Sequence, residues 1–346
     1  MGVAVTTLRA QLLRQDNVYD PFVRAYEQRT GNEWAARGEL TVQVPAGSLS
    51  VVIPAHNCAY SIVPVLDALR CSKVVQPFET VVVDDGSADD TARLACEHPL
   101  RPTVVVLPMR QGAPVARNVG TAVANGTTIL YLDADMVLPP HVVQEFAAHA
   151  ADGLVMIGFR HNVPYLLDSD DRLVFPSSEP ELARDHRVRW RAGPGRMLYS
   201  GIELNEPVEG RPLDATDDLR RLGRGAWYYD WDLPRMVVTA MVSMPRSAVL
   251  QAGGFEPEFS GGWGVEDTHL GAKLIAAGLK VVPLRQAVGF HIDPPDAAES
   301  WRQKLSVWPR NIDLYHRLLD RPVPDDGRSW FTRHTDSLLR VSKVFG

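Results

Sequence analysis

The sequence predicts an α/β protein in which helices flank a mostly parallel, Rossmann-like central sheet. Two observations support this fold class. From residue 49 onward, runs rich in β-branched residues alternate with stretches whose apolar residues recur at helical spacing, a pattern typical of a parallel sheet covered by helices. Polar residues follow the predicted strands where they end, and open α/β sheets bind their ligands beyond those ends. We therefore expect a nucleotide-binding type of fold.

Composition narrows the possible partners and compartment. The chain has 346 residues, of which 45% are hydrophobic and 23% charged, and a formal net charge of -6. An acidic balance argues against nucleic acid as the main partner. No apolar stretch is long enough to cross a membrane, and the N-terminus lacks the basic-then-apolar pattern of a secretory signal. Three cysteines without metal-ligand spacing indicate free thiols. We expect a cytoplasmic protein.

The chain divides into four segments by pattern. These are an N-terminal extension over residues 1–48, a regular α/β half over 49–140, a second half over 141–300, and a C-terminal helical tail over 301–346. In the extension, residues 7–15 and 21–28 indicate short helices and residues 40–44 a strand. In the regular half we expect strands at 49–53, 79–83, 103–107 and 128–132, with helices at 62–69, 89–96 and 114–124.

The strand at residues 128–132 runs directly into two carboxylates. Side chains alternate faces along a strand, so Asp133 and Asp135 should point the same way. Paired carboxylates there suit a hard divalent cation, Mg²⁺ or Mn²⁺, shared with the phosphates of a substrate. The alternative is a polar turn after a strand, where Asp is common.

Other strand ends carry further polar residues. Asp84 or Asp85 can accept from a base N–H group or a ribose hydroxyl, and Gly86 permits a sharp turn after them. Arg117 lies near the start of a predicted helix, where its planar fork can bind a diphosphate. Its alternative role is a surface ion pair.

Four motifs in this order carry a family resemblance. VVIPAHN, VVVDDGSADDT, GAPVARNVG and YLDADM resemble the donor half of family 2 glycosyltransferases with the GT-A fold, over residues 49–140. The resemblance implies that this half binds a nucleotide-diphosphate sugar. It also implies that the base and ribose are bound by Pro54, Asn57 and one of Asp84 and Asp85, of which we favour Asp85. Arg117 would lie near the base or the diphosphate. Asp133 and Asp135 would bind the metal.

A second block, GGFEPEFSGGWGVEDTHLGAKLIAAG, places Glu266 and Asp267 in the first turn of a helix. A helix N-terminus favours negative charge, so a well-capped helix is the alternative. The block resembles the acceptor-side motif of galactosyltransferase-like and chondroitin-polymerase-like enzymes. This resemblance implies that Asp267 is the general base, that Glu266 binds acceptor hydroxyls, and that Trp263 forms a platform. Val265 stands where many such motifs carry a glycine.

Around this block the pattern is less regular. Residues 154–235 are rich in charge and proline, and we expect loops and short helices forming a lid or insertion. Its aromatic residues can line an acceptor groove or pack a small core; they are Trp190, Trp227, Tyr228, Tyr229 and Trp231. Strands are expected at 280–284 and 287–290, followed by His291. In related GT-A enzymes a histidine there completes the metal site, although a buried core histidine is the alternative.

The tail carries apolar residues at helical spacing from Trp301 to Leu318, which predicts a helix packing on the domain, and a surface arm after Arg321. Together these features predict a metal-dependent, inverting hexosyltransferase that uses a nucleotide-diphosphate sugar, preferably a UDP-sugar. The acceptor is expected to be a glycan, a peptide or a small molecule.

A retaining enzyme of the polypeptide N-acetylgalactosaminyltransferase type and a non-catalytic nucleotide-sugar or glycan-binding module are the alternatives. A sugar-nucleotide nucleotidyltransferase needs a glycine-rich, basic loop after the first strand, and PAHNCAYS is not one. A dinucleotide-dependent oxidoreductase is disfavoured because no Gly-x-Gly-x-x-Gly follows that strand.

Overall fold

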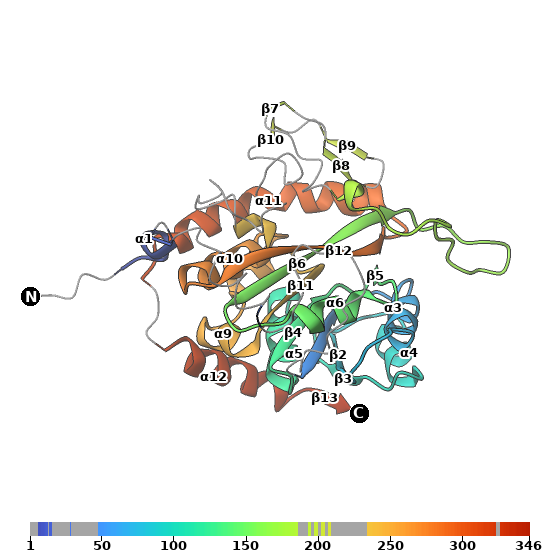
Figure 1. Cartoon of the computed structure of the whole chain (residues 1–346), viewed down its shortest axis with the longest axis horizontal. Coiled ribbons are helices and arrows are strands. Elements are labelled where there is room, and N and C mark those ends of the chain that lie inside the picture. Colours follow the sequence, from blue (N-terminus) through green and yellow to red (C-terminus); the bar gives the residue numbers. More distant parts are fainter. Residues whose placement is uncertain are drawn as a thin grey trace, which may run out of the picture.

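A nine-stranded mixed sheet runs through the described part of the protein (Figure 1). The computed structural model describes residues 6–12, 14–15, 28, 48–185, 234–322 and 326–346, and the backbone of four short strands between residues 193 and 208. The strand order in the sheet is β13-β3-β2-β1-β4-β11-β6-β12-β5. Helices cover both faces of this sheet.

The first half of the sheet agrees with the sequence prediction. It is formed by β1 (Leu49–Ala55), β2 (Glu79–Asp84), β3 (Thr103–Val106) and β4 (Thr128–Leu132). These four strands are mutually parallel, with β1 paired to both β2 and β4. Their carboxyl ends therefore meet at one edge, and the four predicted strands are confirmed.

The second half of the sheet is mixed. Its strands are β5 (Met136–Val137), β6 (Leu154–Val163), β11 (Met241–Pro245) and β12 (Lys280–Ile292). β11 is antiparallel to both β4 and β6, whereas β12 is parallel to β6 and antiparallel to β5. The two strands predicted at 280–284 and 287–290 are one strand, β12, with a register shift between Pro283 and Val288.

Two sequence predictions were wrong in this region and at the end of the chain. Residues 154–163 were expected to be loop but form β6, because the apolar run LVMIGF is buried on both faces of the sheet. Residues after Arg321 were expected to be a surface arm. They form α12 (Gly327–Leu339) and β13 (Lys343–Phe345), which pairs with β3 and covers that edge of the sheet.

The helices divide between the two faces of the sheet. The first face carries α3 (Ile62–Arg70), α4 (Thr91–Glu97) and α6 (Val142–His149), and the opposite face carries α5 (Ala113–Val123), α9 (Arg246–Gln251) and α10 (Glu266–Ala276). Alternation along β1 explains the division, since Val51 and Ile53 belong to the first core and Val52 to the second. Gly120 lets α5 approach β1 closely, because a Cβ there would lie 2.3 Å from Val52 Cγ1.

The remaining elements lie around this framework. They are α1 (Leu8–Leu12), the long α11 (Ala297–Leu319), the 3₁₀ turns η1 (Leu182–Arg184), η3 (Pro234–Met236) and η4 (Pro257–Gly261), and the short strands β7 (Gly193–Pro194), β8 (Met197–Tyr199), β9 (Ile202–Leu204) and β10 (Pro207–Val208). α1 confirms part of the helix expected at 7–15, and α11 confirms the predicted tail helix. The strand expected at 40–44, all but the last residue of the helix expected at 21–28, and the five aromatic residues between 190 and 231 lie outside the described residues.

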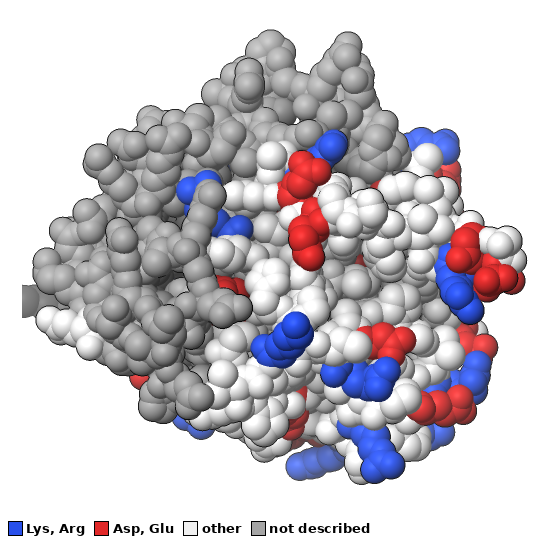
Figure 2. All heavy atoms as spheres, turned by 45° about the vertical axis from the view of Figure 1, so that its right-hand side comes forward, with Lys and Arg blue, Asp and Glu red and all other residues white. Residues whose placement is uncertain are grey.

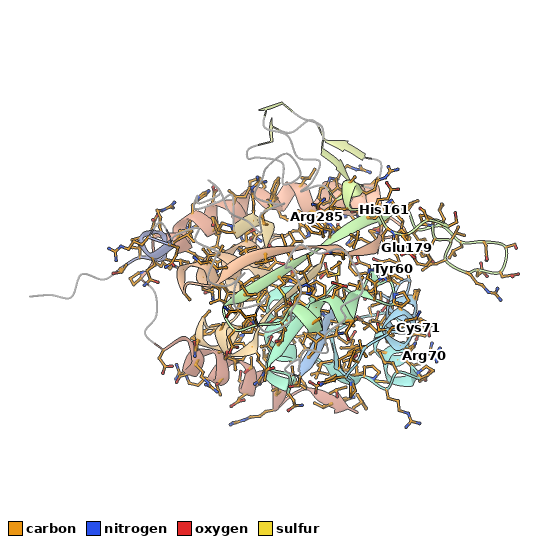
Figure 3. The ribbon with its side chains drawn as sticks, viewed as in Figure 1. Tyr60, Arg70, Cys71, His161, Glu179 and Arg285 are labelled. Atoms are coloured by element: carbon orange, nitrogen blue, oxygen red, sulfur yellow. The ribbon has the colours of Figure 1, made fainter. Side chains whose placement is uncertain are left out.

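Surface features agree with the composition. Acidic and basic side chains are interspersed on the described part of the face in Figure 2, with no single-sign patch there. Among the described residues, no helix combines the length and apolarity needed to cross a bilayer. Cys58, Cys71 and Cys96 are free, as expected, and Cys71 follows Arg70 at the end of α3 (Figure 3).

Candidate active site

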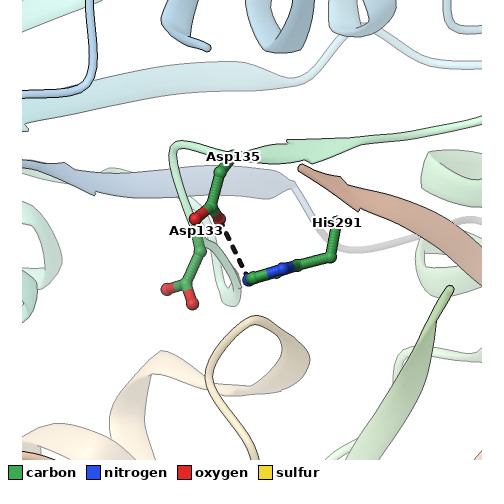
Figure 4. A group of neighbouring side chains, drawn as sticks. All are labelled: Asp133, Asp135 and His291. Atoms are coloured by element: carbon green, nitrogen blue, oxygen red, sulfur yellow. Dashed lines mark ion pairs between the residues drawn. The ribbon is translucent and has the colours of Figure 1, made fainter. Parts of the chain in front are cut away.

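Three potential metal ligands converge beyond the end of β4. Asp133 and Asp135 follow β4, His291 lies near the end of β12, and one ligand atom of each lies within 4.8 Å of the other two (Figure 4). Asp135 Oδ1 lies 3.3 Å from His291 Nε2. The backbone sets this arrangement, because His291 is paired with Met136 of β5 and the Ile292 amide donates to the Asp135 carbonyl at 2.8 Å.

The electrostatics of this cluster favour a cation. Burial, and then the neighbouring charge of Asp133, raise the pKa of Asp135. Burial lowers the pKa of His291, so its imidazole is neutral. Asn162 Nδ2 lies 3.0 Å from His291 Nδ1 and donates to Asp293 Oδ1 at 3.2 Å, which holds the ring from behind. Two carboxylates and a neutral imidazole with such support are a donor set that fits Mn²⁺.

A second pair of carboxylates lies at the start of α10. Glu266 and Asp267 occupy its first turn, as predicted. Asp267 Oδ1 accepts from the Thr268 amide at 2.8 Å, and Oδ2 accepts from the Thr239 amide at 3.4 Å. Burial, followed by the charge of Glu266, raises the pKa of Asp267 to about 7. A carboxylate with such a pKa can accept a proton near neutral pH.

Arg117 joins the two carboxylate groups. Its guanidinium donates to Asp133 Oδ1 at 3.0 Å and to Glu266 Oε1 at 2.9 Å. The residue is only 5% exposed. The sequence suggested a diphosphate contact or a surface ion pair for Arg117, and acceptor hydroxyls for Glu266. Here both side chains are engaged with each other, and the arginine belongs to a buried network.

One cavity of about 540 Å³ connects most of the predicted site. Its lining includes these predicted residues: Asn57, Arg117, Asp133, Asp135, Trp263, Glu266, Asp267 and His291. Pro54, Asp84 and Asp85 are not among the described residues that line it. The Asp85 carboxylate instead accepts from the amides of Gln111 and Gly112, at 2.6 and 2.8 Å, and Asp84 Oδ2 accepts from the Ser87 amide at 3.2 Å.

The sequence did not indicate that α11 forms a wall of this cavity. Trp301, Lys304 and Trp308 of α11 line it beside Trp263. The Trp263 ring packs edge-on against Trp301 at 5.1 Å and Trp308 at 6.5 Å, and Lys304 Nζ lies 5.6 Å from the centre of the same ring. Trp301, Lys304 and Trp308 are separated by three and four residues, a spacing that places their side chains on one face of the helix. The sequence predicts only that this helix packs on the domain, and does not assign its tryptophans to the site.

Val265 holds the loop before α10 in a strained conformation. It is the N-cap residue, with φ 73° and ψ -11°, in the left-handed region that β-branched residues rarely adopt. Its side chain is 5% exposed and belongs to the core beneath α10. Packing of that side chain therefore offsets the backbone strain at the position where related motifs carry a glycine.

Comparison with known proteins identifies two similar domains. Residues 50–194 match the domain described as glycosyl transferase family 2, and residues 220–292 match the N-terminal domain of galactosyltransferase. Residues 50–194 are therefore similar to a family 2 glycosyltransferase domain. The resemblance to that family, predicted from the four donor-side motifs, is thereby confirmed.

Two curated relatives illustrate the match. Validoxylamine A glucosyltransferase of Streptomyces hygroscopicus subsp. jinggangensis (strain 5008) is 30% identical over 265 residues, which cover 70% of this chain and 54% of the relative. Chondroitin synthase of Escherichia coli is 24% identical over 313 residues, covering 87% of this chain and 42% of that protein. The chain spans about half the length of these relatives.

Solved structures confirm the GT-A fold. The mannosyltransferase PcManGT of Pyrobaculum calidifontis, in complex with GDP-Man and Mn²⁺, superposes with a TM-score of 0.51 at 18% identity, covering 96% of this chain and 82% of that one. GalNAc-T7 with UDP, GalNAc and Mn²⁺ superposes with a TM-score of 0.53 at 15% identity, covering 91% and 62%. At these sequence identities the two structures show only that the fold is shared.

Proposed function

We propose that this protein is a metal-dependent, inverting glycosyltransferase that transfers a sugar from a nucleotide-diphosphate sugar, preferably a UDP-sugar, to a hydroxyl group of an acceptor. One observation carries the proposal: the Asp133–Asp135–His291 cluster and the carboxylate of Asp267 line the same cavity. The solved GT-A relatives with GDP-Man or UDP and Mn²⁺ support a nucleotide donor and this metal.

The donor side would use the residues beyond β4. Asp133, Asp135 and His291 would hold Mn²⁺ or Mg²⁺, which when bound neutralises charge on the leaving diphosphate. Asn57 lines the same cavity and is proposed to contact the nucleotide. Asp85 ties down the loop at Gln111 and Gly112 and would shape the base end of the site from outside the cavity.

The acceptor side would use the start of α10. The acceptor oxygen attacks the anomeric carbon as the bond from that carbon to the diphosphate oxygen breaks, and the electron pair leaves with the diphosphate. The proton of the acceptor hydroxyl passes to the Asp267 carboxylate. Attack from the face opposite to the leaving group inverts the anomeric configuration. Trp263 would carry the acceptor ring on its face, and Arg117 would hold Glu266 and Asp133 in place.

A donor screen tests this function. The full chain is incubated with UDP- and GDP-sugars, with Mn²⁺ or with EDTA, and nucleotide release is measured. We expect Mn²⁺-dependent hydrolysis of one donor class and its loss in Asp135→Ala. Equal turnover in EDTA would remove the metal from the mechanism. Binding of nucleotide sugars without any turnover or transfer would favour a binding module, and a product with retained configuration would exclude Asp267 as the base for inversion.

A further inference from the structure

A second cavity of about 520 Å³ lies behind α10, apart from the residues that line the proposed transfer site. Its walls come from α1, α9, α10, α11 and α12. Its lining includes His269 and Lys273 of α10 and the C-cap residue Ala277, which are spaced four residues apart and so lie on the same side of the helix. Each residue turns a helix by about 100°, so Asp267 lies about 200° away from His269. The volume falls in the range of ligand sites, about 300–1,000 Å³.

Two buried polar side chains of α10 line this cavity. His269 is 4% exposed, and its Nδ1 atom has no hydrogen-bond partner among the described residues. Burial lowers the pKa of His269 well below its ordinary value, so the imidazole is neutral. Lys273 Nζ donates to the carbonyl oxygens of Ala252, at 2.8 Å, and Gly254. A buried ring nitrogen without a partner is costly unless a ligand or water satisfies it.

The other polar groups of the cavity balance in charge. Glu258 forms an ion pair with Arg321 at 2.6 Å. Glu256 has no ion pair within the described ranges. Burial lowers the pKa of Lys273 to about 8, and the negative charge of Glu256 partly opposes that shift. The lining therefore holds two carboxylates, two cationic side chains and one neutral histidine. A ligand with a net charge gains little there, whereas hydroxyl groups can donate to Glu256 and pair with His269.

An aromatic ring completes this set. Trp330 of α12 lines the cavity, and its indole stacks on His334 with ring centres 5.2 Å apart and planes 9° apart. The ring is thereby held at the cavity wall by a neighbour from its own helix. Flat aromatic faces pack well against the apolar C–H face of a sugar ring.

We propose that this cavity binds a neutral carbohydrate of one or two rings, at a site separate from the one where transfer takes place. Hydroxyl groups of the sugar would donate to Glu256 and pair with His269, and one ring would lie against Trp330. Because α10 carries Asp267 on one side and His269 on the other, the two sites share a helix as their common wall.

The experiment is a binding screen on the full chain. Glucose, galactose, N-acetylglucosamine, maltose and lactose are the neutral probes, and glucosamine, glucuronate and UDP are the charged ones. EDTA is present and no donor is added, so that the transfer site lacks its metal. Binding is detected by saturation-transfer NMR, and dissociation constants are obtained by titration. The variants are Glu256→Gln and Trp330→Ala, with Trp263→Ala as the matched control in the transfer cavity.

We expect at least one neutral sugar to bind, and both Glu256→Gln and Trp330→Ala to weaken its binding by about tenfold, the effect of losing one good contact. The binding that Glu256→Gln and Trp330→Ala weaken should be retained in Trp263→Ala, which removes only sugar contacts in the transfer cavity. Failure of every neutral sugar to bind overturns the proposal, as does binding lost only in Trp263→Ala or a preference for a charged probe. If Trp330→Ala does not fold by circular dichroism, the isosteric Glu256→Gln variant decides the outcome.

Discussion

Asp267 is a carboxylate placed at a cost to stability. Its folded pKa lies above its unfolded value, because burial and Glu266 disfavour the ionised form. Ionising a buried carboxyl group of this kind lowers the free energy of unfolding. This loss of stability is absent below the unfolded pKa, begins as pH rises through it, and is complete above the folded pKa of about 7. At alkaline pH, the ionised form of Asp267 that the proposed proton transfer needs is therefore also the form that lowers the stability of the protein.

Replacing Asp267 with Asn tests both consequences. We expect transfer to fall by at least about 100-fold, the usual contribution of a general base. The free energy of unfolding should rise by about 1–2 kcal/mol at pH 8 and by little at pH 4, because the penalty is then removed only where it exists. Activity assays and thermal unfolding in EDTA at both pH values check this. A variant that keeps full transfer, or that is stabilised equally at both values, contradicts it.

Val265 offers a second test at the scale of one residue. A residue with a Cβ atom pays about 1–2 kcal/mol of backbone strain in the left-handed region, and glycine does not. Val265→Ala keeps that strain and loses part of the core packing, whereas Val265→Gly relieves the strain while losing slightly more packing. We therefore expect Val265→Gly to be more stable than Val265→Ala, the reverse of their order inside a helix.

Urea unfolding of the two Val265 variants and the parent measures this order. If Ala proves more stable than Gly, the positive φ at this position is wrong. Val249, which is buried in α9, is the control position, because there Ala should be the more stable of the two replacements.

At the scale of elements, the donor half was predictable because its signals are local. Each strand from β1 to β4 is a short, buried apolar run, and β1, β2 and β4 are followed by polar residues, so these strands can be recognised from the local sequence. β6 was missed because its apolar start leads into Arg160, His161 and Asn162, which resemble the polar segment that follows. That Trp301 and Trp308 face the cavity depends on where α11 docks, which is a long-range property that helical spacing does not contain.

The buried ion pair between Arg117 of α5 and Glu266 of α10 could not be predicted from the sequence either. Arg117 and Glu266 are 149 positions apart, and only the folded chain brings them within 2.9 Å. The arginine thus links the middle of α5 to the start of α10 and to the residue that follows β4. It positions carboxylates on both sides of the proposed reaction.

Two substitutions of Arg117 test this linkage. Arg117→Met leaves Asp133 and Glu266 buried without their cation, and we expect it to lower the free energy of unfolding by about 3–5 kcal/mol. Arg117→Lys keeps the charge but cannot span both carboxylates, so its loss should be smaller. Added Mn²⁺ should restore part of the stability of the Met variant by neutralising Asp133. Denaturant unfolding with and without Mn²⁺ measures these effects. Equal losses of stability in both variants would show that Arg117 does not need to bridge the two carboxylates.

At the scale of the whole molecule, the proposed metal site joins both halves of the sheet. Asp133 and Asp135 follow β4 in the parallel half, and His291 belongs to β12 in the mixed half. A ligand bound across them stabilises only the folded arrangement, in which the halves are paired through β11. Binding should therefore appear in the cooperative unfolding of the protein.

Thermal unfolding with Mn²⁺ and UDP measures that coupling. At a ligand concentration 100 times the dissociation constant, we expect about 2.7 kcal/mol of added stability and a rise in Tm of about 4 °C. UDP in EDTA should give a smaller rise, and Asp135→Ala should abolish the effect of Mn²⁺. A rise in Asp135→Ala equal to that of the parent would show that the cation binds elsewhere.

The pairing of β5 with β12 has a consequence for how such a centre can change its ion. Main-chain hydrogen bonds keep residue 291 opposite residue 136 whatever side chains they carry. An exchange at position 291 would then alter the chemistry offered to the cation while leaving the scaffold unmoved. In the proposed metal site, a carboxylate in place of the imidazole would create an all-oxygen centre, which favours magnesium or calcium over manganese. One substitution would then change the metal preference without changing the backbone.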